Sequence, residues 1–132
     1  MKILIADDEL NNCTLLQKLL EPYGISDIVV DGLEAVDAFV MAHADGEPYE
    51  LICMDIMMPE MDGNQAVKAI RQKEQELGVT SAEEVKILMV TALDSPKDVM
   101  NSFYKAGCSD YLVKPLSKDK VDEKMLALGY TL

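Results

Sequence analysis

The stretch Leu51-Ile-Cys-Met-Asp55 decides the fold, because an unbroken apolar run ends in a carboxylate. Such a run indicates a strand that is buried on both faces, as in a parallel sheet covered by helices. Similar short apolar runs occur before and after it. The strands expected from these runs are Ile3–Ala6, Ile28–Val30, Leu51–Met54, Ile87–Val90 and Tyr111–Val113.

Amphipathic segments between these runs predict the helices. The first two helices are expected over Glu9–Tyr23, which Gly24 follows as a stop signal, and over Leu33–His43. A third helix should begin near Asn64 and end at Gly78. Ser95 and Pro96 open a fourth helix, and the last runs from Ser117 to about Gly129. Strands that alternate with helices are joined by right-handed parallel crossovers. We therefore expect one α/β domain over residues 1–132, a doubly wound five-stranded parallel sheet with helices on both faces.

In such a sheet the functional crevice lies beyond the carboxyl ends of the strands. The residues that follow the strands there are Asp7, Asp8, Asp55, Thr91 and Lys114. Three carboxylates at one edge must bind a cation, pair with a basic side chain or retain a proton. Lys114 can offset one charge, and the all-oxygen ligand set suits Mg²⁺.

Phosphoryl transfer is the chemistry that this set of residues favours. A carboxylate can attack phosphorus and form an aspartyl phosphate, while a metal ion and a lysine balance the charge. The hydroxyl of Thr91 would donate to a phosphoryl oxygen. Each residue also has an ordinary structural interpretation, as an acid at a helix start, a threonine at a strand end or a solvated lysine. Their joint placement after four strands favours the functional interpretation.

Composition narrows the classes of partner. The formal charge is −12, from 24 acidic and 12 basic residues, and it would repel nucleic acid and anionic lipid, so neither direct DNA binding nor membrane binding is expected. The apolar run at the N-terminus stops at Asp7, so no signal peptide is predicted. Cys13, Cys53 and Cys108 belong to no paired metal-binding motif, which indicates reduced thiols and a cytoplasmic location.

Five segments contain or flank the residues discussed above: Lys2-Ile-Leu-Ile-Ala-Asp-Asp8, Asp31-Gly-Leu-Glu-Ala35, Asp55-Ile-Met-Met-Pro-Glu-Met-Asp-Gly63, Met89-Val-Thr-Ala92 and Ala106-Gly-Cys-Ser-Asp-Tyr-Leu-Val-Lys-Pro115. Together these segments resemble the CheY-like response-regulator receiver family of two-component signalling. The resemblance covers essentially the whole chain. It implies the flavodoxin-like strand order 2-1-3-4-5 and a stand-alone response regulator.

The resemblance also implies how the site would work. Asp55 would accept a phosphoryl group from a phosphohistidine of a sensor histidine kinase or a phosphotransfer protein. Asp7 and Asp8 would hold Mg²⁺, with direct ligation by Asp8, Asp55 and the backbone carbonyl of Met57.

The remaining implied roles concern catalysis and signal output. Asp55, Thr91 and Lys114 would be the catalytic residues, and the Lys114–Pro115 peptide bond would be cis. Thr91 and Tyr111 would form a switch that changes the face of the fourth helix, fifth strand and fifth helix and so controls a protein partner. The chain would catalyse only its own phosphorylation and self-dephosphorylation, and would otherwise not be an enzyme.

The sequence departs from the family pattern in two places. The segment from Arg71 to Glu84 is several residues longer than is typical, so the third helix or the following loop is expected to be extended. Met57 and Leu93 are apolar at positions that in this family influence how water reaches the phosphoryl group. Our hypothesis is therefore a slow self-dephosphorylation.

Three other functions compete with this one. A phosphatase of the haloacid-dehalogenase kind needs a second acid two positions after its nucleophile, where this chain has Met57. A flavodoxin-like FMN carrier is disfavoured because Asp7 and Asp8 would oppose a bound phosphate. A protein-binding adaptor that works without phosphorylation remains the serious alternative, and the intact set of acids, Thr91 and Lys114 argues against it.

Overall fold

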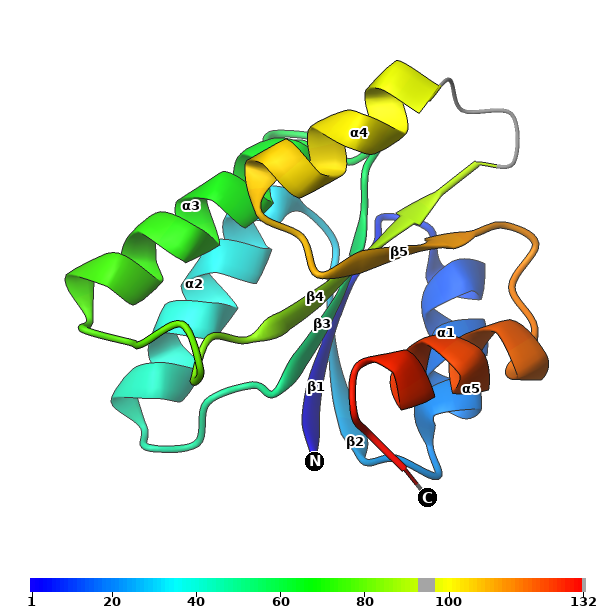
Figure 1. Ribbon diagram of the computed structural model, residues 1–132, viewed down its shortest axis with the longest axis horizontal. Coiled ribbons are helices and arrows are strands. Elements are labelled where there is room, and N and C mark those ends of the chain that lie inside the picture. The colour runs from blue at the N-terminus through cyan, green and yellow to red at the C-terminus, as the bar shows by residue number, and fades with distance from the viewer. Residues whose placement is uncertain (93–96, 132) are drawn as a thin grey trace.

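The computed structural model describes residues 1–92 and 97–131, apart from the side chains of residues 97–100 and 102. Its centre is a parallel sheet with the order β2-β1-β3-β4-β5 (Figure 1). The strands are β1 (Lys2–Ala6), β2 (Ile25–Val29), β3 (Leu51–Asp55), β4 (Lys86–Thr91) and β5 (Asp110–Val113). This arrangement confirms the predicted doubly wound fold and its strand order.

Helices cover both faces of the sheet. They are α1 (Leu10–Leu20), α2 (Gly32–Ala44), α3 (Gly63–Glu76), α4 (Lys97–Ala106) and α5 (Lys118–Ala127). Figure 1 shows α1 and α5 on one face, and α2, α3 and α4 on the other. None of the helices within the described ranges is both long and apolar enough to cross a membrane.

The apolar run of β3 is explained by the two cores that the sheet separates. Ile52 and Met54 point into the core under α2, α3 and α4, whereas Leu51 and Cys53 point into the core under α1 and α5. Successive side chains of a strand point to opposite faces, so a strand between two cores is apolar throughout. All five residues of β3 are accordingly buried.

The first helix and the second strand differ from their predicted bounds. Strand β2 begins at Ile25, earlier than the expected Ile28. The apolar pattern did not reveal this start, because Ser26 and Asp27 are polar, as residues of an edge strand can be. Helix α1 ends at Leu20 and not at Tyr23. Gly24 is therefore not its terminator. It permits close packing instead, since a Cβ there would lie 2.1 Å from the carbonyl oxygen of Met1.

Other predicted boundaries are confirmed. Gly78 follows the end of α3 and has a φ of +75°, a conformation that suits glycine. The hydroxyl of Ser117 accepts a hydrogen bond from the backbone N–H of Lys120 and caps α5. The expected helix start at Ser95 and Pro96 lies outside the described residues.

The segment that the sequence predicts to be extended contains the end of α3 and its connection to β4. Helix α3 continues to Glu76, and a connection over residues 77–85 precedes β4. The guanidinium of Arg71 donates to the carbonyl of Gly107 at 2.9 Å and to the buried carboxylate of Glu74 at 2.7 Å. The other carboxylate oxygen of Glu74 accepts the N–H of Val85 at 2.8 Å. We call Arg71 and Glu74 the buried clasp, because they join α3, the start of β4 and the α4–β5 turn.

Candidate functional site

Three carboxylates meet at the carboxyl ends of β1 and β3, as the sequence predicted. Oxygen atoms of Asp7, Asp8 and Asp55 all lie within 4.8 Å of one another. Asp7 and Asp55 are buried, with 2% and 6% of their surface exposed, whereas Asp8 is exposed. The structure thus confirms the acidic cluster and adds that two of its three members are largely withdrawn from water.

Strand pairing and one glycine position this cluster. Ala6 pairs with Met54 in the parallel ladder of β1 and β3, so the acids that follow end at the same level. After Asp55 the chain turns sharply into α3. Gly63 makes this turn possible, because a Cβ there would lie 2.5 Å from the carbonyl oxygen of Asp55. Asp62 then caps α3 through a reciprocal pair of hydrogen bonds with Gln65.

The environment of Asp55 disfavours its negative charge when no cation is bound. Burial and, second, the neighbouring charge of Asp7 raise the pKa of Asp55 to about 6. The ammonium of Lys114, 3.8 Å from Asp55 Oδ1, and a backbone hydrogen bond from Met57 act in the opposite direction. The single lysine does not compensate for the burial and the other acids. The pocket therefore favours an additional positive charge.

Asp7 provides an independent test of whether a metal ion fits. Its Oδ1 accepts the backbone N–H of Glu9 at 2.9 Å. Its Oδ2 is buried and has no hydrogen-bond partner within residues 1–92 and 97–131. A buried carboxylate oxygen without a partner is costly, and a bound cation would remove that cost. The donor set, made only of oxygen, fits a hard divalent ion.

The predicted hydroxyl and lysine lie on the β4–β5 side of the acids. Thr91 ends β4 and is 1% exposed. Lys114 follows β5, and its backbone N–H donates to the carbonyl of Thr91 at 2.8 Å, which holds the two residues together. The Lys114–Pro115 peptide bond is cis, as the resemblance implied.

Two predicted residues lie at the margin of the site. Met57 follows Asp55 in the β3–α3 loop, and its side chain is 78% exposed. Tyr111 lies on β5, partly buried against the core of α2, α3 and α4. Tyr111 pairs with Met89, two positions before Thr91, so it lies back from the strand ends where the acids meet. Leu93, the other position expected to influence water access, lies outside the described residues.

Sequence reasoning missed one neighbour of the acids. The buried thiol of Cys13 donates to the carbonyl of Asp7 at 3.3 Å. Burial, and second the charge of Asp7, raise the pKa of this thiol to about 11. Cys13 therefore stays protonated and supports the loop as a donor. Its place on the buried side of α1 was the available signal, since Leu16 and Leu20 share that side.

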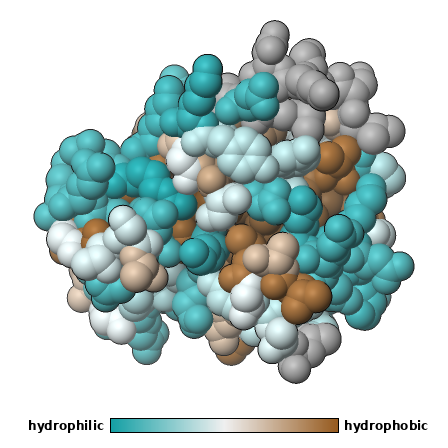
Figure 2. Space-filling view, in the orientation of Figure 1, coloured by the Kyte–Doolittle hydropathy of each residue, from teal (hydrophilic) through white to brown (hydrophobic). Residues whose placement is uncertain are grey.

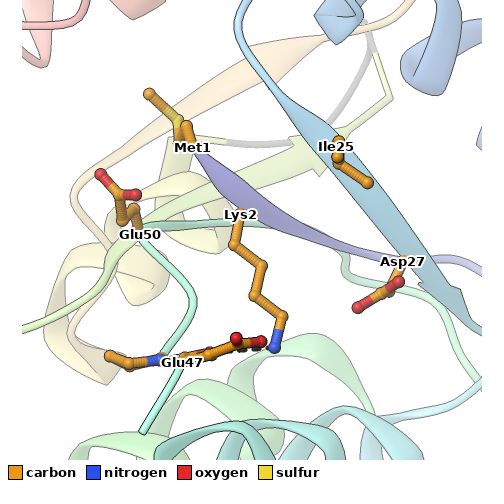
Figure 3. Close-up of a pocket in the computed structure, with 7 residues that line it drawn as sticks. Met1, Lys2, Ile25, Asp27, Glu47 and Glu50 are labelled. Carbon is orange, nitrogen blue, oxygen red and sulfur yellow. Dashed lines mark hydrogen bonds between the residues drawn. The ribbon is translucent and has the colours of Figure 1, made fainter.

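A second cleft lies at the opposite end of the sheet, where β1 and β2 begin (Figure 3). It has a volume of about 700 Å³ and contains none of the predicted site residues. The side chain of Lys2 extends into it and donates to the carbonyl of Glu47 at 2.9 Å. The predicted site residues therefore lie at the carboxyl ends of the strands and not in this cleft.

Comparison with known proteins agrees with this geometry. Residues 3–126 match the family described as "Response regulator receiver domain". The two-component response regulator 24 of Arabidopsis thaliana is 40% identical over 119 residues, which are 89% of this chain and 76% of the relative. Two further curated relatives are much longer proteins, the sensor histidine kinase GacS of Pseudomonas protegens and the hybrid signal transduction histidine kinase L of Dictyostelium discoideum, and the chain spans only 13% and 7% of their length.

Two of the solved structures that share the fold are receiver domains with 28% and 27% sequence identity to this chain. The receiver domain of the sensor histidine kinase PA1611 from Pseudomonas aeruginosa, solved with a magnesium ion in its active-site cleft, has a TM-score of 0.73 and 28% identity, covering 96% of this chain and 94% of its own. The receiver domain of Ssk1 from Saccharomyces cerevisiae, solved with the histidine phosphotransfer protein Ypd1, has a TM-score of 0.81 and 27% identity, covering 100% and 92%. Because the family match extends over almost the whole chain, and relatives of similar length and fold are themselves receivers, the chain belongs to the response regulator receiver domain family of two-component signalling.

Proposed function

We propose that Asp55 accepts a phosphoryl group from a phosphohistidine of a sensor histidine kinase or a histidine phosphotransfer protein, in a reaction that requires Mg²⁺. The strongest support is that Asp55 lies close to Asp7, Asp8 and Lys114 at the carboxyl ends of the strands. A lone buried carboxylate would be a poor acceptor of a negatively charged group. Here the surrounding residues supply places for the compensating charges.

The transfer exchanges one bond for another at phosphorus. A carboxylate oxygen of Asp55 attacks phosphorus, and the P–N bond to the histidine breaks. The electron pair of that bond stays on the imidazole nitrogen. The histidine side chain leaves as neutral imidazole, because its other ring nitrogen carries a proton. Mg²⁺, when bound by Asp7, Asp8, Asp55 and the Met57 carbonyl, would neutralise charge on the phosphoryl oxygens.

Residues on the other side of Asp55 would bind the product. Lys114, which already lies 3.8 Å from Asp55 Oδ1, would pair with the phosphoryl group. Thr91, at the end of the neighbouring strand, would donate its hydroxyl to a phosphoryl oxygen. Because the backbone N–H of Lys114 donates to the carbonyl of Thr91, a movement of Thr91 would be passed to the end of β5, the strand that carries Tyr111. The face of α4, β5 and α5 would then control a protein partner.

The relatives support the choice of donor. The structure of Ssk1 with Ypd1 pairs a receiver with a histidine phosphotransfer protein, and the PA1611 receiver comes from a histidine kinase.

The three cysteines of the present chain are free and buried. Free thiols suit a reducing compartment, so we place the reaction in the cytoplasm.

The direct test is intact mass after incubation with Mg²⁺ and acetyl phosphate, beside the variant Asp55→Asn. The wild type should gain one phosphoryl group and lose the gain under chelation, whereas the variant should gain none. If neither protein is modified by this donor or by candidate kinases, the adaptor that works without phosphorylation becomes the better explanation.

A further inference from the structure

The carboxylate of Asp110 joins all three elements of the α4–β5–α5 face. One of its oxygens, Oδ1, accepts hydrogen bonds from the hydroxyl of Tyr104 on α4 at 3.3 Å, from the backbone N–H of Tyr111 on β5 at 2.8 Å and from the ammonium of Lys124 on α5 at 3.0 Å. We call Asp110, Tyr104 and Lys124 the Asp110 cluster. A single oxygen atom of Asp110 thus links α4, β5 and α5.

The same residues enclose the ring of Tyr111. The Lys124 ammonium lies 5.2 Å from the centre of the ring, within the range of a cation–π interaction. The ring of Tyr104 meets it edge-on at 6.1 Å. Phe103, which is fully buried, bounds it from the core side at 6.4 Å. Lys124 thus makes two attachments, to the carboxylate of Asp110 and to the ring.

The ring lies on the outer side of β5. Tyr111 lines a surface groove between β5 and α5, together with Lys120 and Glu123. Figure 2 shows this face, on which hydrophobic patches interrupt a hydrophilic surface. The side chains of Lys124 and Asp110 are 29% and 22% exposed, so water screens their interaction less than it screens a surface ion pair. For the ring to move inward toward Thr91, it must leave the ammonium of Lys124.

We propose that Lys124, paired with Asp110, is a positioning residue that holds Tyr111 on the outer side of β5 and sets how readily the ring leaves that place. The proposal rests on the proposed function, because phosphorylation of Asp55 is what would draw the ring inward. Lys124 touches neither the phosphoryl group nor the metal site. Its role is to set the balance between two places of the ring before phosphorylation begins.

The test is ¹⁹F NMR of the full chain labelled with 3-fluorotyrosine, with the resonance of Tyr111 assigned by Tyr111→Phe. Lys124→Met keeps the apolar stem and removes the charge. In this variant the inward position of the Tyr111 ring should become about three- to tenfold more populated without any phosphodonor. This is the size expected for losing a cation–π contact and a partly exposed ion pair. Lys124→Arg keeps the charge and should restore the wild-type spectrum. Asp110→Asn, which loosens the ammonium, should shift the resonance in the same direction as Lys124→Met.

Lys118→Met is the matched control, since it removes another lysine of α5, whose partner is Asp122 and not Asp110. The proposal is overturned if Lys124→Met and Asp110→Asn leave the Tyr111 resonance unchanged, or if Lys118→Met shifts it equally. These comparisons are made on unphosphorylated protein. They therefore remain decisive even if intact mass shows that Asp55 accepts no phosphoryl group, a result that would count against the proposed function alone.

Discussion

At the scale of single residues, Asp55 shows how the fold prepares a carboxylate for reaction. Its pKa is raised to about 6 chiefly because it is buried and secondly because Asp7 is charged. The folded chain therefore holds a proton on Asp55 more tightly than the unfolded chain does. The contribution of this proton to stability is complete below the unfolded pKa of about 4 and is lost as the pH rises through about 6.

This sign gives a prediction for metal binding. In EDTA, the free energy of unfolding should fall by about 1–2 kcal/mol between pH 4.5 and pH 7.5 through Asp55, a value reduced from the full shift because the pocket is partly open to water. Mg²⁺ should stabilise the protein more at pH 7.5 than at pH 4.5. Urea unfolding at both pH values measures this. In Asp55→Asn, the part of the pH dependence that Asp55 causes should disappear, and an unchanged slope would contradict the assignment.

A second residue-scale prediction concerns the lifetime of the phosphorylated protein. The thioether of Met57 cannot orient a water molecule by hydrogen bonding as an amide can, and its side chain is 78% exposed beside the pocket. Met57→Gln should therefore shorten the decay of the phosphorylated form several-fold, as followed by intact mass at neutral pH with Mg²⁺. Met41→Gln, which changes a methionine 65% exposed on α2, should leave the decay unchanged. A rapid decay of the wild type would contradict the hypothesis of slow hydrolysis.

At the scale of elements, residues at the ends of helices predicted the helix boundaries, whereas contacts between residues distant in sequence could not be predicted. Ser117 and Gly78 mark helix ends because caps and terminators act over a few residues. The start of β2 could not be placed, because this edge strand is only partly buried, so polar residues such as Ser26 and Asp27 fit within it. The buried clasp was likewise invisible, because Arg71 finds Gly107 only after α3 and α4 have packed together.

The buried clasp carries the prediction at this scale. Arg71→Met would leave the carboxylate of Glu74 buried without its cation, so the free energy of unfolding should fall by about 3–5 kcal/mol. Arg71→Met combined with Glu74→Met should recover part of the loss, because no unpaired charge then remains. Lys73→Met, from an exposed pair with Glu76 on the same helix, should cost no more than about 1 kcal/mol. Equal losses for Arg71→Met and Lys73→Met in urea unfolding would show that burial of the clasp does not matter.

At the scale of the whole molecule, the sheet is shared by two cores. The sequence predicted this arrangement, because five apolar runs and the helices between them allow few other topologies. It also predicted that the acids meet, since the parallel order alone brings Asp7 and Asp55 to one edge. Burial and the pKa of Asp55 could not be predicted, since they depend on side chains that pack from several elements.

The shared sheet predicts that the chain unfolds as one unit. Leu16 on α1 and Ile70 on α3 are both fully buried but lie in different cores. Leu16→Ala and Ile70→Ala should each cost about 2–5 kcal/mol and lower the same single transition, because β1, β3 and β4 contribute side chains to both cores. Their effects should add to within about 0.5 kcal/mol, since the two side chains lie in different cores on opposite faces of the sheet. Far-ultraviolet circular dichroism and tyrosine fluorescence should report coincident midpoints in each variant. A variant in which one signal changes before the other would show that the two cores can unfold separately, and the chain would then not be a single cooperative domain.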